Sequence, residues 1–532
     1  MTDRPAIVIA ATPTPNGDLH VGHLAGPYLA GDIFARYLRA IGRPVRYATA
    51  TDDSQTYVLT TAARQGISPE QLCAKSTAAI QRSIEAMGIS MAPLPPIDEG
   101  YRRWVLEFVS NLHTAGALHT RTVRLPYSET AGYLYDGLLS GYCPTCLAGS
   151  SGGACEDCGH PNNYDELLEP TAVLDPDGPP VSYREHTILT LPMENYRDRL
   201  TEYFTTRAGS WRPHPMQLVR ELLAGPLPEI PITVPGNWGI AAPFAPTPGQ
   251  VLYPWVEGVA AAIYASWYAG ADRSGPVDAG WRADAGVELV YFHGFDNTYH
   301  WSVMDLVMLM AHGERYQLPE ITICNEFYEL DGAKFSTSRN HLIRGIELLA
   351  EVPRDLVRFY LALTAPENQR TNFTVDELCR VTEQRLVQPW NSLADAVSLL
   401  GMSGVRTPLP ISPDGRRRAA ALAERITSCY RLPGFSIARA ARTVAEQLAR
   451  LRAEADADRP PGDLLLQART LLACAAPILI DLAEQATAGG IDLRPAVEQP
   501  TSITAFELPR LAYPAGAGQD TPTRSPALDG AV

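Results

Sequence analysis

The chain has 532 residues, enough for about three domains that each bury a core. No apolar run approaches the length of a membrane span and no signal peptide is recognisable at the start, so we expect a cytoplasmic protein with no membrane partner. The formal charge of −15 argues against a protein that grips DNA through its overall field, although a local basic face can still bind RNA.

An apolar run and a histidine-containing turn open the chain. Residues 6–11 predict a buried parallel strand that leads into the segment Pro13–Gly26. Apolar residues then recur at helical spacing from Val21 to Leu38, which places His20 and His23 on one side of the first turn. The free N–H groups and the positive dipole end of such a turn form a cradle for phosphate. The competing interpretation is that both histidines only cap and pack the helix start.

A second strand is predicted over residues 46–50, and an acidic pair follows it. Asp52 stands directly after this strand, where open α/β sheets place ligand contacts. Alternatively, Asp52 is the N-cap of the next helix. Helical patterns then cover residues 68–88 and 97–117.

Four of the nine cysteines form two C-x-x-C pairs separated by eight residues. They are Cys143, Cys146, Cys155 and Cys158. Four thiolates at this spacing suit a tetrahedral Zn²⁺, and because all four ligands are protein atoms the metal is predicted to be structural. Two disulfides are the alternative, which a cytoplasmic location disfavours.

Two further strand-like runs precede the second half of the predicted sheet. The sheet is expected to resume over residues 252–257 and to continue over residues 287–293, directly before Gly294-Phe295-Asp296. Lysine is nearly absent from the chain, since only Lys75 and Lys334 occur among 44 basic residues. Lys334 in the segment Lys-Phe-Ser-Thr-Ser therefore indicates a specific role, because a chance basic loop in this chain would carry arginine.

The motifs resemble the class I aminoacyl-tRNA synthetase family, and most closely its methionyl-tRNA synthetases. The H-x-G-H of residues 20–23 resembles the HIGH motif, the segment 334–338 resembles the KMSKS loop, and the cysteine pairs resemble the zinc knuckle of the family's connective insertion. The resemblance implies an α/β fold with a Rossmann-type (HUP) parallel-sheet catalytic domain, a zinc-knuckle connective insertion and a C-terminal α-helical bundle. Thr337 departs from the loop motif, where many relatives carry a second lysine.

The resemblance also implies roles for individual residues. His20, His23 and Lys334 are the expected catalytic residues, which stabilise phosphoryl charge. The expected ATP-binding residues are Asn16, Gly17, Gly22, Asp296, Ser336 and Ser338. The expected amino-acid-binding residues are Asp52, which holds the α-ammonium group, and Thr12, Thr14, Trp255, Val259, Ala262 and Trp301, which surround the side chain.

Two departures from the family bear on the substrates. Among the six side-chain pocket positions only Trp255 fits, because the family carries leucine, tyrosine, proline, tyrosine and histidine at the others. Threonines and Ala262 remove apolar surface that a methionine thioether would bury, so we expect a different amino acid, small or polar. A shifted alignment is the competing explanation.

The second departure lies in the helical region 376–491, which looks like the family's anticodon-binding bundle. Its first helix lacks the family's N-x-x-x-R pair, Pro389 interrupts it, and no tryptophan follows Trp390. We therefore predict a bundle that has lost its base-reading residues. The last twenty residues are expected to be disordered.

The sequence thus predicts an ATP-dependent, AMP-forming ligase with structural Zn²⁺ and with Mg²⁺ bound to ATP. It would form an aminoacyl-adenylate and transfer the amino acid to a small-molecule amine, hydroxylamine or hydroxyl in natural product biosynthesis. The alternatives are a methionine–tRNA ligase, either housekeeping or antibiotic-resistant, and an inactive regulatory relative. The predicted segments are the first catalytic half, 1–117; the connective insertion, 118–235; the second catalytic half, 236–330; the KMSKS-like loop and stem-contact region, 331–375; the bundle, 376–493; and an extended tail, 494–532.

Overall fold

The computed structural model describes residues 4–162, 165–335, 341–402, 408–455, 460–494 and 500–513. The chain divides into two compact units. The first comprises residues 1–345, 362–372 and 425–440, and the second comprises residues 346–361, 373–424 and 441–532. None of the helices in these described ranges is long and apolar enough to cross a bilayer.

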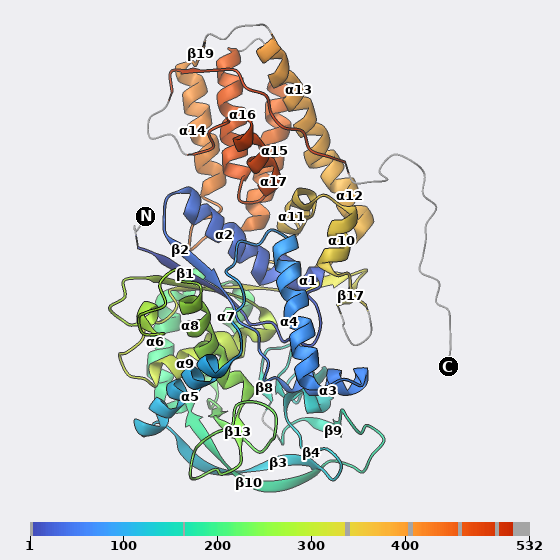
Figure 1. The fold of residues 1–532 in the computed structure, drawn as a ribbon, viewed down its shortest axis with the longest axis vertical. Coiled ribbons are helices and arrows are strands. Elements are labelled where there is room, and N and C mark those ends of the chain that lie inside the picture. The colour runs from blue at the N-terminus through green and yellow to red at the C-terminus, as the bar shows by residue number, and fades with distance from the viewer. Residues whose placement is uncertain are drawn as a thin grey trace. The chain divides into compact units, whose positions relative to one another are not determined.

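A four-stranded parallel sheet lies at the centre of the first unit (Figure 1). Its order is β15 (Ile321–Asn325), β14 (Glu288–Gly294), β1 (Ala6–Ala10) and β2 (Val45–Ala48). Every residue of β1 is buried, as expected for a strand covered on both faces. The predicted α/β class is confirmed, and strands occur where the runs 6–11, 46–50 and 287–293 predicted them.

The first helix is interrupted once. It consists of α1 (Val21–His23), a π-helical turn η1 (Leu24–Tyr28) and α2 (Leu29–Ala40). Pro27 lies inside the π turn, which absorbs a residue that cannot donate an N–H in a regular helix. The apolar periodicity from Val21 to Leu38 therefore predicted the helix but not the irregular turn.

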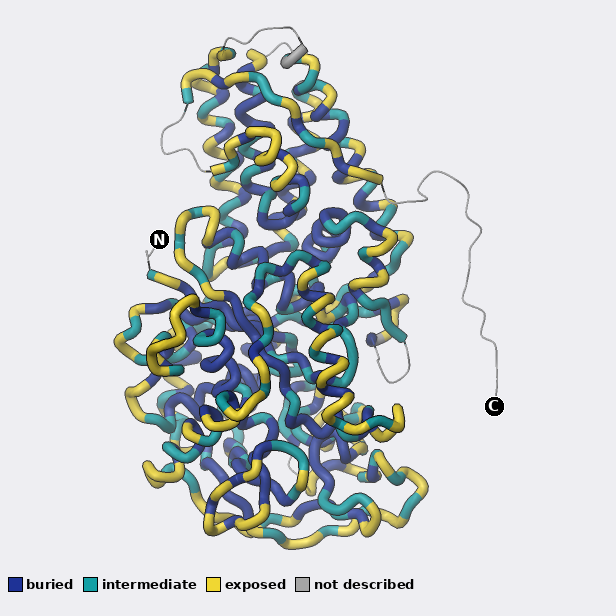
Figure 2. The backbone as a smooth tube through the Cα atoms, in the orientation of Figure 1, coloured by how far each residue is buried: buried dark blue, intermediate teal, exposed yellow. Residues whose placement is uncertain are grey.

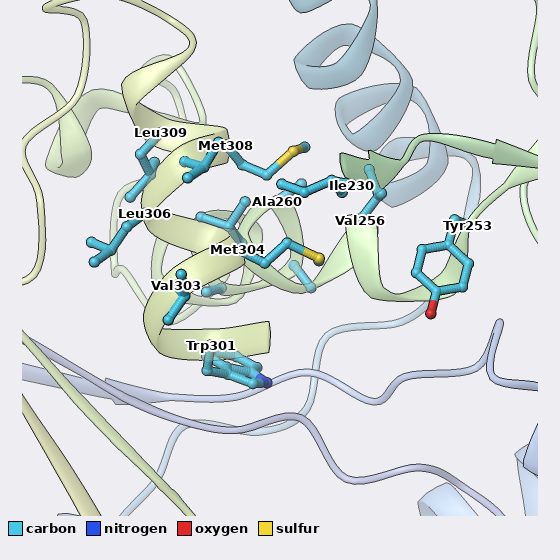
Figure 3. Packing of buried hydrophobic residues seen from close by; sticks show 14 of the residues in the cluster. Ile230, Tyr253, Val256, Ala260, Trp301, Val303, Met304, Leu306, Met308 and Leu309 are labelled. Atoms are coloured by element: carbon cyan, nitrogen blue, oxygen red, sulfur yellow. The ribbon is translucent and has the colours of Figure 1, made fainter. Parts of the chain in front are cut away.

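Helices α2 and α8 both pack on β1 and β2. The remaining helices of the catalytic region are α3 (Thr56–Gln65), α4 (Pro69–Ala86), α5 (Glu99–Thr114), α8 (Glu257–Tyr268), the π turn η8 (His300–Met304) and α9 (Asp305–Met310). The inner faces of α5, α8, η8 and α9 share one buried core with Ile7 and Ile9 of β1, whereas Val58 and Ala62 of α3 pack with Leu72 and Cys73 of α4 in a separate small cluster. Figure 2 colours the buried parts of the chain dark blue. Figure 3 shows part of this core, where Met304 and the leucines of α9 lie near Ala260 of α8.

The expectation that the sheet resumes over residues 252–257 is wrong. β13 (Val251–Leu252) pairs antiparallel with β12 (Thr233–Val234), outside the central sheet, and a 3₁₀ turn η5 (Pro254–Val256) follows. Pro254 explains the change, because its fixed φ suits a helical first turn and it has no N–H for a strand ladder.

The segment between α5 and η5 is built mainly from antiparallel strands. One sheet has the order β11 (Glu229–Pro231), β10 (Ser182–Pro192), β3 (His119–Ser128) and β4 (Gly132–Tyr133). The smaller strands are β5 (Leu139–Tyr142), β6 (Gly149–Ser151), β7 (Gly153–Ala154), β8 (Pro161–Asn162) and β9 (Leu168–Ala172), and the helices are α6 (Arg197–Arg207) and α7 (Pro213–Ala224). Beyond α9, β16 (Tyr328–Leu330) pairs antiparallel with β17 (Ala333–Lys334).

The C-terminal region is helical, as predicted. Its elements are α10 (Gly345–Glu351), α11 (Arg354–Leu363), β18 (Thr371–Phe373), α12 (Val375–Thr382), η9 (Glu383–Val387), α13 (Gln388–Met402), β19 (Leu409–Pro410), α14 (Pro413–Thr427), α15 (Ile437–Ala455), α16 (Pro461–Ala475), α17 (Ile480–Ala488) and β20 (Ser502–Ile503). Pro389 does not end its helix. The π turn η9 ends two residues before Pro389, and α13, which contains Pro389, continues to Met402.

Part of the C-terminal tail packs on this helical unit. The Trp390 indole donates to the Pro509 carbonyl at 2.8 Å, and Asn391 exchanges two hydrogen bonds with the Leu511 backbone, at 3.0 and 2.9 Å. The tail is therefore ordered within residues 500–513, whereas the predicted disorder of the last twenty residues concerns positions outside the described ones.

Candidate active site

A cavity of about 500 Å³ lies at the carboxyl edge of the parallel sheet. Residues at or beyond the carboxyl ends of all four strands line it: 11–14, 16–20, 22 and 23 after β1, Asp52 after β2, Gly294, Asp296 and Asn297 at the end of β14, and residues 325–328 at the end of β15. Parallel strands bring their carboxyl ends to one edge, so segments far apart in sequence meet here. We call the part around the start of α1, where the predicted ATP-binding residues lie, the nucleotide side, and the part around Asp52 and Trp255, where predicted amino-acid-binding residues lie, the amino-acid side.

His20 and His23 form a reciprocal cap at the start of α1. The His23 backbone N–H donates to His20 Nδ1, and the His20 backbone N–H donates to His23 Nδ1, both at 3.3 Å. The rings stack with centroids 3.7 Å apart. Since each Nδ1 accepts, the proton of each neutral imidazole lies on Nε2. Capping and ligand binding are thus compatible, because capping fixes the tautomer and leaves an N–H donor on each ring.

Both imidazoles are held neutral. Burial, with a smaller effect of His23, lowers the pKa of His20 well below its ordinary value, and desolvation lowers the pKa of His23 to about 4. Neutral Nε2–H groups at a helix start can donate to phosphate oxygens without carrying charge.

Two glycines make room for this arrangement. A Cβ at Gly22 would lie 3.0 Å from the His20 ring and 3.1 Å from Phe335, whose ring stacks on His20 at 4.7 Å. A Cβ at Gly294 would lie 2.6 Å from Asp296 Oδ1. The glycines of H-x-G-H and G-x-D are therefore needed to seat His20 and Asp296.

The structure brings most of the predicted ATP-binding residues together. Asn16, Gly17, Gly22 and Asp296 line the cavity with His20 and His23. Ser336 and Ser338 lie outside the described residues, and for Lys334 only the backbone is described, as part of β17. Their predicted roles remain predictions.

Asp52 lines the amino-acid side and is nearly buried. Its Oδ2 accepts from Gln55 Nε2 at 2.8 Å, while Oδ1 has no hydrogen-bond partner among the described residues. Burial, followed by the nearby charge of Glu257, raises the pKa of Asp52 well above its ordinary value. The N-cap interpretation is wrong, because α3 begins after Gln55 and has no side-chain cap.

Two more buried carboxyl groups surround Asp52. Tyr253 donates to Asp136 Oδ1 at 2.9 Å, and Tyr101 donates to Glu257 Oε2 at 3.3 Å. Burial raises the pKa of Asp136 and that of Glu257 to about 7 each. Burial therefore raises the pKa values of the carboxyl groups at and around Asp52, in contrast to those of the imidazoles of His20 and His23, which it lowers.

The predicted side-chain pocket is only partly formed. Thr12, Thr14 and Trp255 line the cavity, whereas Val259, Ala262 and Trp301 are buried and do not line it. The ring of His300 stacks on Trp255 with centroids 3.6 Å apart and an interplanar angle of 4°, and it also lines the cavity. The stacked rings of Trp255 and His300 therefore form part of the wall on this side of the cavity.

The four predicted zinc ligands are brought together. Their sulfur atoms all lie within 4.8 Å of one another, with Cys143 to Cys158 at 3.7 Å and Cys146 to Cys155 at 3.6 Å. Tetrahedral zinc with Zn–S bonds of about 2.3 Å separates its sulfurs by about 3.8 Å, which these distances approach. The cysteines are free thiols, so the disulfide alternative is wrong.

The knuckle also contributes to the cavity. Gly152, Ala154 and Glu156 line it, and a Cβ at Gly152 would lie 2.6 Å from the Asp136 backbone nitrogen. A structural metal held by the four cysteines would therefore fix one wall of the amino-acid side.

Sequence reasoning missed several cavity residues. They are Tyr28, Tyr57, Glu156, Asn297, His300, Asn325 and Phe335. Phe335 had a signal, because it directly follows Lys334 in the recognised loop. His300 directly precedes the predicted Trp301, so an alignment to the family shifted by one residue would have identified it.

Comparisons with known proteins agree with this geometry. A family model described as tRNA synthetases class I (M) matches residues 6–398. The methionine–tRNA ligase of Bifidobacterium animalis subsp. lactis is 31% identical over 417 residues, covering 74% of this chain and 66% of the relative. That of Kineococcus radiotolerans is 30% identical over 414 residues, covering 73% and 68%. The chain thus spans about two thirds of these relatives.

Among solved structures, Mycobacterium tuberculosis methionyl-tRNA synthetase in complex with methionyl-adenylate superposes with a TM-score of 0.74. The two chains are 20% identical, and the match covers 96% of this chain and 100% of the other. At that identity the likeness concerns the fold.

Proposed function

The chain belongs to the methionyl group of the class I tRNA synthetases, and from this premise we propose that it activates an amino acid with ATP and transfers it to tRNA. The observation that carries the proposal is one cavity with two neutral Nε2–H donors at its nucleotide side and the unsatisfied Asp52 carboxyl at its amino-acid side. A triphosphate and an amino-acid ammonium group would bind at these two sides.

In the proposed first step, a carboxylate oxygen of the amino acid attacks the α-phosphorus of ATP. The new P–O bond forms as the bond to pyrophosphate breaks, which yields aminoacyl-adenylate and pyrophosphate. His20 and His23 donate from Nε2 to phosphate oxygens on which charge increases, and Asp52 orients the ammonium group. Because positioning and charge suffice, no side chain forms a covalent intermediate.

Several roles within this step remain proposals. Asp296 would accept hydrogen bonds from the ribose hydroxyls, and Lys334 would follow the charge of the departing phosphates. Mg²⁺ bound with ATP would shield charge on the leaving group. The four cysteines would hold Zn²⁺ as a structural ion, since all four of its positions are then filled by protein.

In the proposed second step, a terminal ribose hydroxyl of tRNA attacks the adenylate carbonyl and AMP leaves. The names of the relatives favour tRNA over the small-molecule acceptor that the sequence predicted. A cytoplasmic location suits these substrates. The six predicted domain boundaries remain part of the proposal.

A small-molecule acceptor is kept as a second candidate because of one observation. Trp390 and Asn391 are both engaged by the segment 500–513, so neither is presented for stacking on an unpaired base. This is the helix on which the family's base-reading pair was expected.

Amino-acid-dependent ATP–pyrophosphate exchange without tRNA tests the first step, over the twenty amino acids. We expect exchange with at least one, and transfer of that labelled amino acid to tRNA from Kineococcus radiotolerans, the source of one of the relatives. Exchange with transfer only to added amines or hydroxylamine would favour the second candidate. ATP binding without exchange across a panel that also includes non-protein amino acids would identify an inactive relative and overturn the proposal.

A further inference from the structure

A second unsatisfied carboxylate lies beyond the end of the cavity. Asp305, the first residue of α9, is 2% exposed, and no hydrogen bond or ion pair to its side chain occurs in the described part of the chain. Burial alone raises its pKa well above the ordinary value, with no contribution from a neighbouring charge. An unpaired buried carboxyl group is costly, so a ligand that satisfies it would bind with a large gain.

Asp305 faces the helix that begins beside Trp255. A Cβ at Gly258 would lie 3.6 Å from Asp305 Oδ1 and 3.9 Å from Oδ2. Gly258 follows Trp255 by three residues where η5 continues into α8, and Asp305 follows His300 by five residues where η8 continues into α9. Asp305 does not line the cavity, but the helical segment that carries it begins with His300, which does.

A second buried polar group near Asp305 also lacks a partner. The Tyr291 hydroxyl on β14 has none among the described residues, and the charge of Asp305 contributes to the raised pKa of this tyrosine. Tyr291 contacts Trp301 edge-on, with ring centroids 5.5 Å apart. One donor and one acceptor are therefore left unsatisfied on two separate elements, and neither residue lines the cavity.

The surroundings of Asp305 are otherwise apolar. Met304 and Leu306, its neighbours in sequence, belong to the buried core, and Figure 3 shows them with Trp301 along the same helical segment. Ala262 and Gly258 keep the facing side of α8 small. With small residues on this face an unbranched side chain would meet the least steric hindrance, and its end group would reach Asp305 only if the Trp255 and His300 rings moved apart.

We propose that Asp305 is the specificity residue of the amino-acid site and that the activated amino acid carries a second basic nitrogen at the end of an unbranched side chain. The α-ammonium binds Asp52 and the terminal ammonium binds Asp305, with the Tyr291 hydroxyl as an additional hydrogen-bonding group. An ammonium group supplies the missing counter-charge that a thioether lacks. This inference rests on the proposed amino-acid activation.

Pairs of amino acids whose side chains are similar in length, one with a terminal amine and one without, test this inference. The kcat/KM of ATP–pyrophosphate exchange is measured for lysine against norleucine, ornithine against norvaline, and methionine, with the full chain. We expect at least one amine-bearing member to exceed its neutral partner by about 100-fold, the discrimination typical of a buried charge pair. Asp305→Asn should remove this preference, whereas Asp272→Asn, an exposed carboxylate after α8, should preserve it.

The outcomes are distinct. Exchange with methionine or norleucine that exceeds exchange with every amine, and that Asp305→Asn leaves unchanged, overturns the inference but keeps the proposed function. No exchange with any amino acid overturns both. Thermal shifts with the amino acids alone give a second readout: wild type should be stabilised more by the amine than by its neutral partner, and a folded Asp305→Asn should lose that difference.

Discussion

Burial shifts the pKa values of the titratable groups on the two sides of the cavity in opposite directions. The nucleotide side uses histidines whose pKa values burial lowers, and the amino-acid side uses carboxyl groups whose pKa values burial raises. The Nδ1 atom of each histidine accepts a hydrogen bond from the backbone N–H of the other, whereas Oδ1 of Asp52 has no partner in the described part of the chain. The ring Nδ1 atoms of the nucleotide side thus already have partners, whereas the proposed ammonium group would supply one to Asp52.

The largest effect is expected from the nucleotide side. His20→Asn keeps a side-chain acceptor that can cap α1 but loses the Nε2–H donor, so we expect exchange to fall by about 10²–10³-fold while the thermal unfolding temperature changes little. Unchanged exchange in this variant would mean that His20 only caps the helix.

Asp52→Asn should act mainly on amino-acid binding. Loss of the carboxylate that pairs with the ammonium group should raise the amino-acid KM about 100-fold and leave the ATP KM nearly unchanged. Asp53→Asn provides the neighbouring control, because Asp53 does not line the cavity. Equal effects of both variants would contradict a specific ammonium site.

The knuckle should have a smaller, indirect effect on the amino-acid side. The purified protein should contain one zinc per chain by elemental analysis, and Cys143→Ser with Cys155→Ser should lose it. Exchange should fall about tenfold through the amino-acid KM, because the knuckle backs onto Asp136. Cys379→Ser, a half-buried cysteine outside the cluster, should keep zinc and activity.

The last prediction concerns how stability depends on pH. It involves the smallest effect on activity, but it shows most clearly the opposite pKa shifts of the two sides. Glu257 has a folded-state pKa of about 7, above an unfolded value near 4, so the folded state binds more protons and this contribution to stability is lost as the pH rises through 7. The lowered pKa of His23 acts oppositely, because its contribution is lost as the pH falls from about 6.5 towards 4. Because of Glu257, the free energy of unfolding of the wild type should fall by about 3 kcal/mol between pH 4 and 8. Glu257→Gln, measured by urea unfolding, should lack this fall. If the free energy of unfolding of Glu257→Gln fell with pH as steeply as that of the wild type, the raised pKa of Glu257 would be contradicted.

The same contrast explains what the sequence could predict. His20, Gly22 and His23 lie within four residues, and the cysteine pairs within sixteen, so their spacing in the chain already specifies their geometry. The strands of the sheet also follow from apolar runs, whereas Pro254 turned one expected strand into a 3₁₀ turn.

The amino-acid side is assembled from distant segments. Trp255, His300 and Asp305 approach one another only through the packing of η5, η8, α8 and α9, and no local pattern indicates that Asp305 would be left without a partner. Burial decides the protonation of these groups, and burial depends on the complete fold.

Proton release on amino-acid binding tests the central contrast most directly. Titration calorimetry at pH 6, in buffers of different ionisation enthalpy, counts the protons exchanged when the amino acid binds without ATP. Because a cation favours the ionised form of Asp52, we predict net proton release, and less release in Asp305→Asn with an amine-bearing amino acid than in wild type. Binding heats that are independent of the buffer would contradict a protonated Asp52 that ionises when the amino-acid ammonium group binds.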